Sequence, residues 1–408
     1  MLAIQYLEPD PVVAAIASTD VRAQLRAAFE RLPISCVILG WDLPGVLMEA
    51  CAREVARASA QLYLWHPLLT GSAAFEPRPE WQAIGLTGEP VPGFRGLPEF
   101  TFVCPNRPAA AEAVLEQLRR VVRHSPYQGV FLDRIRYPSP AHDPDRLLAC
   151  FCPDCQRAAA KEGFDLAAAQ QRIQTLLAAP ERLCSVVQLL LDPSAEATSD
   201  DDLAMLRGFL DLRVRSITRI VQAAAGIVHG EGLAIGLDCF SPALTYMVGQ
   251  DLAALNKPCA WIKIMTYGHT LGPAGLPYEL LGLALWLIGR GAVREAEALD
   301  WLALAAHLPL PPSLGALSEQ GLSPEALGRE TRHARAAGVR TLLAGIELVE
   351  LEGVTRLDQT QIAADLQAFR EAKPDGLVLS WDLRRISLQR LEVVRSIWFA
   401  PHSREGPL

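Results

Sequence analysis

The stretch GVFLDRIRY (129–137) sets the fold class, because a continuous apolar run ends there in charged side chains. Seven other apolar runs, rich in β-branched and aromatic residues and bounded by Pro, Gly or Asp, recur along the chain. They are ISCVILGWD (34–42), QLYLWHPLL (61–69), FTFVCPN (100–106), LAIGLDCF (233–240), WIKIMTY (261–267), TLLAGIELV (341–349) and GLVLSWDL (376–383). Continuous rather than alternating hydrophobicity is typical of strands covered on both faces. The sequence therefore predicts eight strands of a parallel sheet.

Helical patterns fill the gaps between these runs, at 46–60, 109–122, 323–338 and 360–372. Alternating strands and helices indicate a parallel sheet with right-handed crossovers. Eight such units fit an α/β fold of the closed (β/α)₈ TIM-barrel type better than an open doubly wound sheet. We predict three parts: an N-terminal helical lead-in over 1–33, the barrel over 34–400 and a C-terminal tail over 401–408.

Two predicted connections are long, 138–232 after the fourth strand and 268–340 after the sixth. Within the first, LAAAQQRIQTLL (166–177) and LAMLRGFLDLRVRSITRIVQAA (203–224) are amphipathic, which predicts a helical insertion. SAEATSDDD (194–202) predicts a polar turn between those two helices. Both connections leave the C-terminal face of the barrel, where loops build active sites in this fold.

Composition indicates the compartment and the partners. The net charge of -8 and pI of about 5.6 give no basic footprint for nucleic acid. LLGLALWLIG (280–289) is about half the ~20 residues that a membrane span needs. The N-terminal sequence lacks the pattern of a secretory signal. The nine cysteines, an odd number spread through the chain, favour a reducing compartment. We expect a cytoplasmic protein without a nucleic-acid or membrane partner; the oligomeric state is not indicated.

Ionisable and aromatic side chains gather where the predicted strands end. Burying such a charge costs several kcal/mol unless it is paired, so a position at the barrel mouth is favoured. The set is Trp41, Asp42, His66, Asn106, Asp133, Arg136, Tyr137, Asp238, Lys263, Tyr267, His269, Glu347, Trp381 and Asp382. Some of these residues could instead form only a salt-bridge network that closes the barrel top, with Arg136 and Lys263 as counterions.

Two of the acids are candidates for catalysis. Strands four and seven lie nearly opposite each other across a barrel mouth, so Asp133 and Glu347 can face each other across a bound sugar. Glycoside hydrolysis needs such a pair, one to protonate the leaving oxygen and one to attack or activate water. Arg136 is placed to keep Asp133 ionised. The period of two puts Gly345 and Glu347 on one side of their strand, so Glu347 faces inward if the Gly side lines the barrel.

The segment from Asp133 to Pro138 resembles the D-x-x-R-Y-P segment of bacterial glycoside-hydrolase-like barrel proteins. CFCPDC (150–155) looks like a Cys-aromatic-Cys-x-x-Cys element that follows strand four in such barrels. DCFSP, WIKIMTYG and LVLSWDL look like the later strand ends of the same group, so the resemblance covers roughly 129–383. It implies an enzyme that acts on a glycoside or polysaccharide.

A large clan of retaining glycosidases, with acids on strands four and seven, gives a mixed comparison. Tyr267, Glu347 and Trp381 are similar to its supporting Tyr, nucleophile Glu and sugar-stacking Trp. Leu132-Asp133 departs from it, since Asn-Glu is expected there. The roles therefore stay open; we favour Asp133 as nucleophile and Glu347 as acid.

The other strand-end residues would support the pair or line the sugar site. Arg136, Tyr267, Asp238 and Lys263 are the expected supporting residues, and Asp238 could position the substrate or raise the pKa of a neighbour. Flat aromatic faces suit the apolar faces of sugar rings, with polar groups nearby fixing orientation. The expected substrate-binding residues are Trp41, Asp42, His66, Asn106, Tyr137, His269, Trp381 and Asp382.

Three cysteines in the expected insertion form the main competing signal. They are Cys150, Cys152 and Cys155. Their spacing allows three ligands of a tetrahedral structural zinc, with a fourth from Cys184, His124 or His142. The plainer interpretation is three packed thiols. No H-E-x-x-H motif indicates a catalytic zinc, and no phosphate-binding glycine motif indicates a nucleotide, so no cofactor is expected to be required.

Three functions therefore remain open at this stage. The favoured one is a glycoside hydrolase that uses a carboxylate pair at the C-terminal face of the barrel. The second is a non-catalytic carbohydrate-binding barrel whose acids are locked in salt bridges. The third is a metal-dependent hydrolase with a metal held by the strand-end acids. The fold alone does not separate them, because one barrel fold hosts many chemistries.

Overall fold

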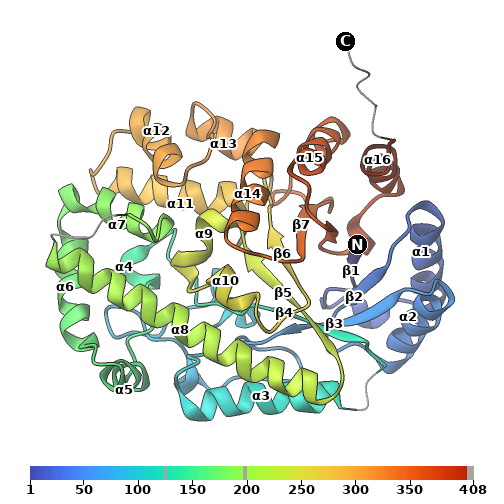
Figure 1. Ribbon diagram of the computed structural model, residues 1–408, viewed down its shortest axis with the longest axis horizontal. Helices are drawn as coiled ribbons and strands as arrows, with labels where there is room; N and C mark the ends of the chain where they lie inside the picture. Colours follow the sequence, from blue (N-terminus) through green and yellow to red (C-terminus); the bar gives the residue numbers. More distant parts are fainter. Residues whose placement is uncertain (124–125, 196–199, 402–408) are drawn as a thin grey trace.

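The computed structural model describes residues 1–123, 126–195 and 200–401 of the chain. Eight parallel strands form a closed barrel, and β1 pairs with both β2 and β8, which closes it (Figure 1). The strands are β1 (Leu2–Tyr6), β2 (Cys36–Leu39), β3 (Gln61–Pro67), β4 (Gly129–Asp133), β5 (Ala234–Phe240), β6 (Trp261–Met265), β7 (Leu342–Glu347) and β8 (Gly376–Ser380). The predicted (β/α)₈ TIM barrel is confirmed.

One predicted strand is wrong, and one strand was missed. The run 100–106 is no barrel strand; Phe102 and Val103 make only isolated antiparallel bridges within the connection between β3 and the next helix. The first strand is instead β1, inside the segment predicted as a helical lead-in. Its apolar run is interrupted by the buried Gln5, which bonds to Lys263 far along the chain. Because one strand was missed and one was wrongly added before β4, the total stays at eight and strands four to eight keep their predicted positions in the order.

Helices surround the barrel. The helices that follow the strands are α1 (Ser18–Arg31), α2 (Gly45–Arg57), α3 (Pro108–Val122), α8 (Asp201–Gly230), α14 (Pro324–Ala336), α15 (Gln359–Ala372) and α16 (Leu388–Trp398). The connection between β5 and β6 carries the short helices α9 (Pro242–Thr245) and α10 (Leu252–Leu255). The four helical patterns predicted between strands match α2, α3, α14 and α15 to within a few residues.

The two long connections are helical, as predicted for the first of them. After β4 come α4 (Pro144–Leu147), α5 (Pro153–Lys161), α6 (Leu166–Ala178) and α7 (Leu183–Leu191), before α8. After β6 come α11 (Leu276–Gly289), α12 (Glu295–Ala305) and α13 (Leu314–Gln320). Figure 1 shows α5, α6 and α7 at the left of the barrel and α1 and α2 at the right. Residues 196–199 of the predicted turn 194–202, and 402–408 of the predicted tail, lie outside the described residues.

Large rings fill the barrel near the N-terminal ends of its strands. Phe131 stacks on Trp261 with ring centroids 5.2 Å apart, and Tyr63 lies 5.6 Å from the same ring. A Cβ at position 236 would lie 2.3 Å from the Trp261 ring, so only Gly236 leaves room for it. This layer is a solid floor, and any cavity in the barrel must lie above it, at the C-terminal ends.

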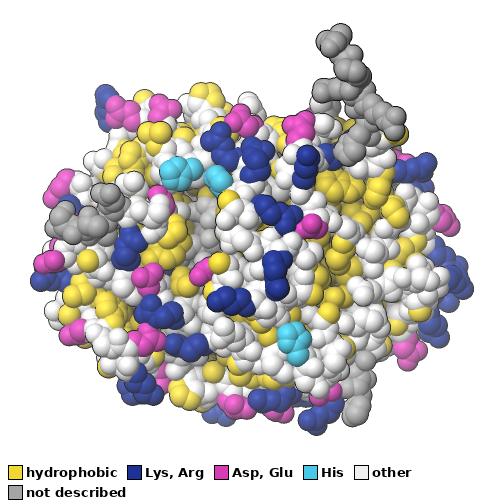
Figure 2. Space-filling view, viewed as in Figure 1, with side chains coloured by type: hydrophobic (Ala, Val, Ile, Leu, Met, Phe, Trp, Pro, Cys, Tyr) yellow, Lys and Arg dark blue, Asp and Glu magenta, His cyan; other side chains and the backbone are white. Residues whose placement is uncertain are grey.

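Membrane-spanning helices and the distribution of surface charge were the two surface features that the sequence bears on. Among the described residues, no helix combines the length and apolarity that crossing a bilayer requires; the apolar run 280–289 lies in α11. Figure 2 shows basic side chains scattered among acidic and apolar ones on the visible face.

Candidate active site

A cavity of about 210 Å³ opens at the mouth of the barrel. Its lining includes three carboxyl groups from three different strand ends: Glu8 after β1, Asp133 at the end of β4 and Asp238 in β5. The aromatic lining includes Trp65 and Trp381. The cavity lies at the C-terminal ends of the strands, the face that carries the active site in this fold.

Asp133 is held by two N–H donors. Its Oδ2 accepts a 3.0 Å hydrogen bond from Trp65 Nε1, and its Oδ1 accepts one from the backbone N–H of Arg134. Trp65 is itself held edge-on against Trp41, with ring centroids 5.3 Å apart. Asp133 is thus a fixed carboxylate that is still partly exposed to the cavity.

Asp238 belongs to a buried polar group beneath the cavity. Lys263 Nζ donates to Asp238 Oδ2 at 3.1 Å, to Gln5 Oε1 at 3.0 Å and to Tyr267 Oη at 2.6 Å. Gly345 makes this possible, because a Cβ there would lie 2.5 Å from Lys263 Cε. Lys263 and Tyr267, expected to support Asp133 and Glu347, thus lie together with Asp238 in one hydrogen-bonded group.

The electrostatics of Asp238 favour a shared or retained proton. Burial raises the pKa of Asp238 to about 7, against the opposing charge of Lys263, and Asp133 nearby raises it further. Within the described residues, Asp238 Oδ1 is buried without a hydrogen-bond partner. An acid of this kind can be neutral or charged near pH 7.

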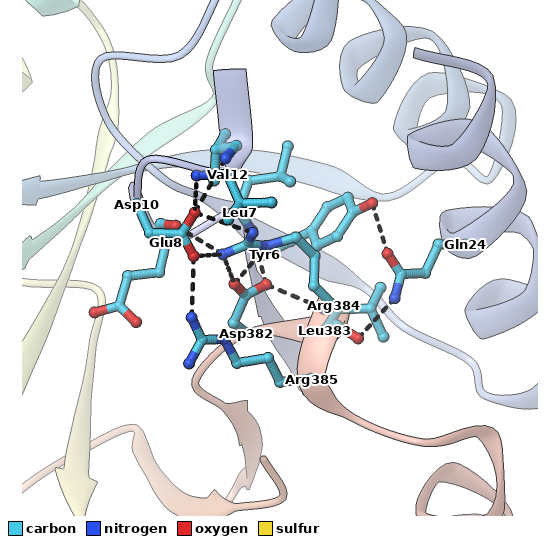
Figure 3. Close-up of polar contacts among 11 residues, drawn as sticks. Tyr6, Leu7, Glu8, Asp10, Val12, Gln24, Asp382, Leu383, Arg384 and Arg385 are labelled. Atoms are coloured by element: carbon cyan, nitrogen blue, oxygen red, sulfur yellow. Dashed lines mark hydrogen bonds and ion pairs between the residues drawn. The ribbon is translucent and has the colours of Figure 1, made fainter. Parts of the chain in front are cut away.

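Glu8 is the acid that sequence reasoning missed, since it follows the strand that was missed. Loss of hydration raises the pKa of Glu8 to about 7, and Arg134 opposes this rise. In Figure 3 its side chain extends away from the neighbouring cluster of Asp10, Asp382 and Arg384. Among the described contacts, no protein group donates a hydrogen bond to its carboxyl. Glu8 is therefore a cavity acid available to a ligand.

The cluster beside Glu8 is structural (Figure 3). Asp382 is fully buried and accepts from Leu7 N at 3.1 Å and from Arg384 Nε at 2.7 Å. Arg384 also pairs with Asp10 at 2.7 Å. These bonds join the end of β1 to the end of β8 and fix the backbone that carries Glu8. The structure thus places Asp382, predicted to bind substrate, in this buried cluster and not in the lining of the mouth cavity.

Glu347 does not share the cavity with Asp133. Gly345 faces the barrel interior, against Lys263, which meets the condition set for an inward Glu347; the connection after β6, however, contacts the Glu347 carboxyl. Its Oε1 accepts a 2.6 Å bond from His269 N, and the side chain is 1% exposed. The His269 ring bonds to Asp365 Oδ2 at 3.0 Å and to Gln320 O at 2.9 Å. Neither Glu347 nor His269 is among the residues that line the mouth cavity.

This second cluster is coupled electrostatically. Burial raises the pKa of Glu347 to about 7, and the charge of His269 opposes it. Burial lowers the pKa of His269, but its bond to Asp365 and the charge of Glu347 outweigh burial and raise it to about 9. The arrangement is a buried group of two acids and one histidine that joins the connection after β6 to α15; within the described residues, Glu347 Oε2 and Asp365 Oδ1 have no hydrogen-bond partner. The structure thus does not bring together the predicted pair on strands four and seven.

Three other predicted sugar-binding residues point elsewhere. His66 is buried in β3, and burial lowers its pKa to about 4. Asn106 donates to Cys155 Sγ at 3.3 Å, beside the helical insertion. Tyr137 is fully buried under the Arg213 guanidinium, 4.9 Å from its ring centroid. None of the three lines the mouth cavity.

The predicted tryptophans and Asp42 do lie near the mouth. Trp381 lines the mouth cavity, 5.7 Å from the Tyr267 ring. Trp41 and Asp42 line a neighbouring cavity of about 570 Å³, and Asp42 Oδ2 accepts from Ala74 N at 2.9 Å. Trp381 is partly exposed, whereas Trp41 is 7% exposed and the Arg134 guanidinium lies over its ring, 5.3 Å from the centroid.

Arg136 lies at the mouth but does not pair with Asp133. Its guanidinium lies between the rings of Phe102 and Phe240, at 4.5 Å and 4.6 Å, and donates to Tyr137 O at 3.1 Å. Burial lowers its pKa to about 10, although it keeps its charge at neutral pH. Arg136 thus brings a positive charge to the cavity wall rather than an ion pair.

Three cavities adjoin one another at the barrel mouth, and together we call them the cleft. Glu8 and Arg134 line both the 570 Å³ cavity and the mouth cavity. Arg136 lines both the mouth cavity and a third cavity of about 290 Å³, and Phe100 lines all three. Tyr278 supplies a further ring in the third cavity. The acids are at the centre of this cleft.

The group of cysteines is larger than the motif predicted. Among the described residues, one set of metal-ligating side chains is close enough for a single ion, and it adds Cys104 to the three of the motif: Cys104, Cys150, Cys152 and Cys155. Cys184 is not in this set. His142 contacts Tyr278 instead, with ring centroids 4.0 Å apart, and His124 lies outside the described residues.

Fold and site together define a TIM barrel with an acid-lined cleft, and solved structures of similar fold are glycoside hydrolases. No protein-family model matches the chain, and no curated protein matches its sequence. The glycoside hydrolase domain of PgaB (BpsB) from Bordetella bronchiseptica superimposes with a TM-score of 0.56 at 14% identity, over 97% of this chain and 98% of that one. The β-amylase catalytic domain from Paenibacillus polymyxa gives 0.56 at 11% identity, over 97% of each chain.

A third neighbour is a β-galactosidase from Marinomonas ef1, with a TM-score of 0.53 at 10% identity over 97% of this chain and 59% of that one. Identities this low establish a likeness of fold alone. The chain therefore has a glycoside-hydrolase-like TIM-barrel fold, and its chemistry must be argued from its own site.

Proposed function

We propose that this protein is a glycoside hydrolase that uses Asp133 and Glu8 as its carboxyl pair. The observation that carries the proposal is that these two acids, in different environments, line one cavity at the C-terminal face of a glycoside-hydrolase-like barrel. The Asp133 carboxyl accepts two N–H bonds, whereas the Glu8 carboxyl accepts none among the described contacts. Pairs of acids whose environments differ in this way divide acid and base roles between them. The D-x-x-R-Y-P resemblance at Asp133 supports the same function.

Each acid has a role that follows from its surroundings. Glu8, with its pKa raised to about 7 by loss of hydration, keeps a proton near neutral pH and donates it to the leaving oxygen. Asp133, held by its two N–H donors, acts as nucleophile or as the base that activates water. Asp238 adds negative charge beneath them, and Lys263 holds it in place. Arg134 limits the rise in the pKa of Glu8 and borders the same cavity.

The cleft indicates a substrate longer than one sugar. The mouth cavity of about 210 Å³ has larger cavities on both sides, of about 570 and 290 Å³. Aromatic rings border each side: Trp41 on one, Tyr278 on the other. We therefore assign an oligosaccharide or polysaccharide chain as the substrate, cleaved between sugars bound on the two sides of the acids.

The test is hydrolysis of a panel of aryl glycosides and oligosaccharides of increasing length. Asp133→Asn and Glu8→Gln should each lower kcat at least about 100-fold, the lower end of what general acid–base catalysis contributes. Glu8→Gln should lose much less on dinitrophenyl glycosides, whose leaving group needs no proton. Glu319→Gln, an exposed glutamate remote from the cleft residues, is the matched control and should keep full activity.

The pH dependence tests the acid role separately. Activity should fall as pH rises through about 7, because Glu8 then loses the proton it must donate. Glu8→Gln should lack this basic limb. Full activity in both Glu8→Gln and Asp133→Asn contradicts the proposal, and so does sugar binding without turnover of any member of the panel, which supports a carbohydrate-binding barrel instead.

A further inference from the structure

The four cysteines brought together by the fold lie away from the cleft acids. Cys104 comes from the connection between β3 and α3, Cys150 and Cys152 precede α5, and Cys155 lies in its first turn. Their four Sγ atoms lie within 4.8 Å of one another, and each side chain is at most 1% exposed. We propose that they form a tetrathiolate site for one zinc ion, which fastens the helical insertion to the barrel.

The sulfur distances fit a shared ion. A zinc–sulfur bond of about 2.3 Å in a tetrahedral site places the sulfurs about 3.8 Å apart. Cys104 Sγ lies 3.4 Å from Cys155 Sγ and 3.6 Å from Cys152 Sγ. A disulfide would need sulfurs about 2.05 Å apart and would bond them in pairs. One cysteine in contact with two others is the arrangement of ligands around a common centre.

The surroundings are those of thiolates. Ile84 N donates to Cys150 Sγ at 3.3 Å, and Asn106 Nδ2 donates to Cys155 Sγ at 3.3 Å. The Arg107 guanidinium lies beside Cys152 and pairs with Asp154 at 3.2 Å. Four thiolates around a divalent ion carry a net charge of −2, which N–H donors and a nearby cation stabilise. Asn106, predicted to bind sugar, thus has a different role: it orients a ligand.

The site lies where the insertion and the connection after β3 run side by side. Phe151 N donates to Ile84 O at 2.9 Å, and Gly85 bridges to Ala149, so the Cys150 segment lies along the connection after β3. Cys104 lies at the end of that connection, immediately before α3. A metal held here cross-links the insertion to the barrel wall. The role is structural, since all four ligand positions are filled by protein.

Metal analysis of the full-length wild type, expressed with added zinc and purified without chelator, is the direct test. We expect one zinc per chain. Cys104→Ser and Cys155→Ser should each lose it, whereas Cys184→Ser and Cys259→Ser, cysteines outside the group, should keep it. Wild type without metal, one iron per chain in place of zinc, or zinc that survives both Cys104→Ser and Cys155→Ser overturns the proposal.

A second measurement covers variants that fail to fold. Metal-free wild type is titrated with cobalt(II), which should give the visible bands and sulfur-to-cobalt charge transfer of a tetrahedral tetrathiolate at one equivalent. Zinc should then abolish those bands and raise the Tm of the protein. Octahedral cobalt spectra, or mass spectra of wild type that show these four cysteines as two disulfides, contradict the assignment. Neither readout depends on glycosidase activity.

Discussion

Replacing Lys263 with methionine should lower the free energy of unfolding, because it leaves the buried Asp238 without its counterion. Lys263 is fully buried, and its Nζ donates to Asp238, Gln5 and Tyr267. Methionine keeps most of the volume but removes the charge that Asp238 faces. Removing one partner of a buried ion pair costs about 3–5 kcal/mol, because the other charge is left uncompensated. We expect that loss in the free energy of unfolding at pH 8.5, where Asp238 is ionised.

The loss should be smaller at pH 5.5. The pKa of Asp238 is raised to about 7 by burial while Lys263 opposes the rise, so without Lys263 it goes higher. At a pH above the pKa of Asp238, each further unit by which that pKa rises destabilises Lys263→Met by about 1.4 kcal/mol more. At a pH below it, the acid is neutral in both proteins and adds nothing to the difference. Urea unfolding followed by tryptophan fluorescence and circular dichroism at both pH values gives the difference.

Two further variants sharpen this experiment. Lys257→Met removes an exposed lysine and should change stability by no more than about 0.5 kcal/mol. Adding Asp238→Asn to Lys263→Met should restore part of the lost stability, because the unpaired acid is gone. A loss below about 1 kcal/mol for Lys263→Met, equal at both pH values, refutes the reasoning about this buried pair.

Three other predictions follow from packing, linkage and stacking. Gly345→Ala should cost about 1–3 kcal/mol, since the new Cβ lies 2.5 Å from Lys263 Cε, whereas Gly226→Ala, in open space within α8, should stabilise by about 0.5–1 kcal/mol; thermal unfolding decides both. For Asp238→Asn, the free energy of unfolding should rise relative to that of the wild type by on the order of 4 kcal/mol between about pH 4 and about pH 7. The wild type loses stability over that interval because folding raises the pKa of Asp238; a difference between the two proteins that stays constant with pH rules this out. Trp381→Ala should raise KM for oligosaccharides about tenfold or more, the loss of about 1.4 kcal/mol of binding, and an unchanged KM removes that residue from the sugar site.

The barrel could be predicted because fully covered parallel strands are apolar along their whole length. The same signal misled at two places. FTFVCPN (100–106) is apolar because it packs beneath the insertion as part of a connection, where Phe102 covers the Arg136 guanidinium. LAIQY (2–6) is a strand whose Gln5 faces Lys263, and a partner so distant in the chain leaves no local pattern.

The site was predicted in part for related reasons. Asp133 and Asp238 were found because strand ends at the barrel mouth are recognisable, and Glu8 was missed with its strand. The alternation along β7 correctly placed Glu347 on the Gly345 side, but which loop covers a side chain depends on tertiary packing. The cysteine motif likewise indicated three ligands, whereas Cys104 is brought in by the fold.

The central claim is that Glu8, rather than Glu347, is the acid that works with Asp133. The most direct measurement is kcat/KM of Glu8→Gln and Glu347→Gln, both confirmed as folded, on an aryl glycoside with a poor leaving group that the wild type hydrolyses. We predict a loss of at least about 100-fold for Glu8→Gln and a change of only a few-fold for Glu347→Gln. The reverse order, with Glu347→Gln inactive and Glu8→Gln active, contradicts the account and restores the pair on strands four and seven.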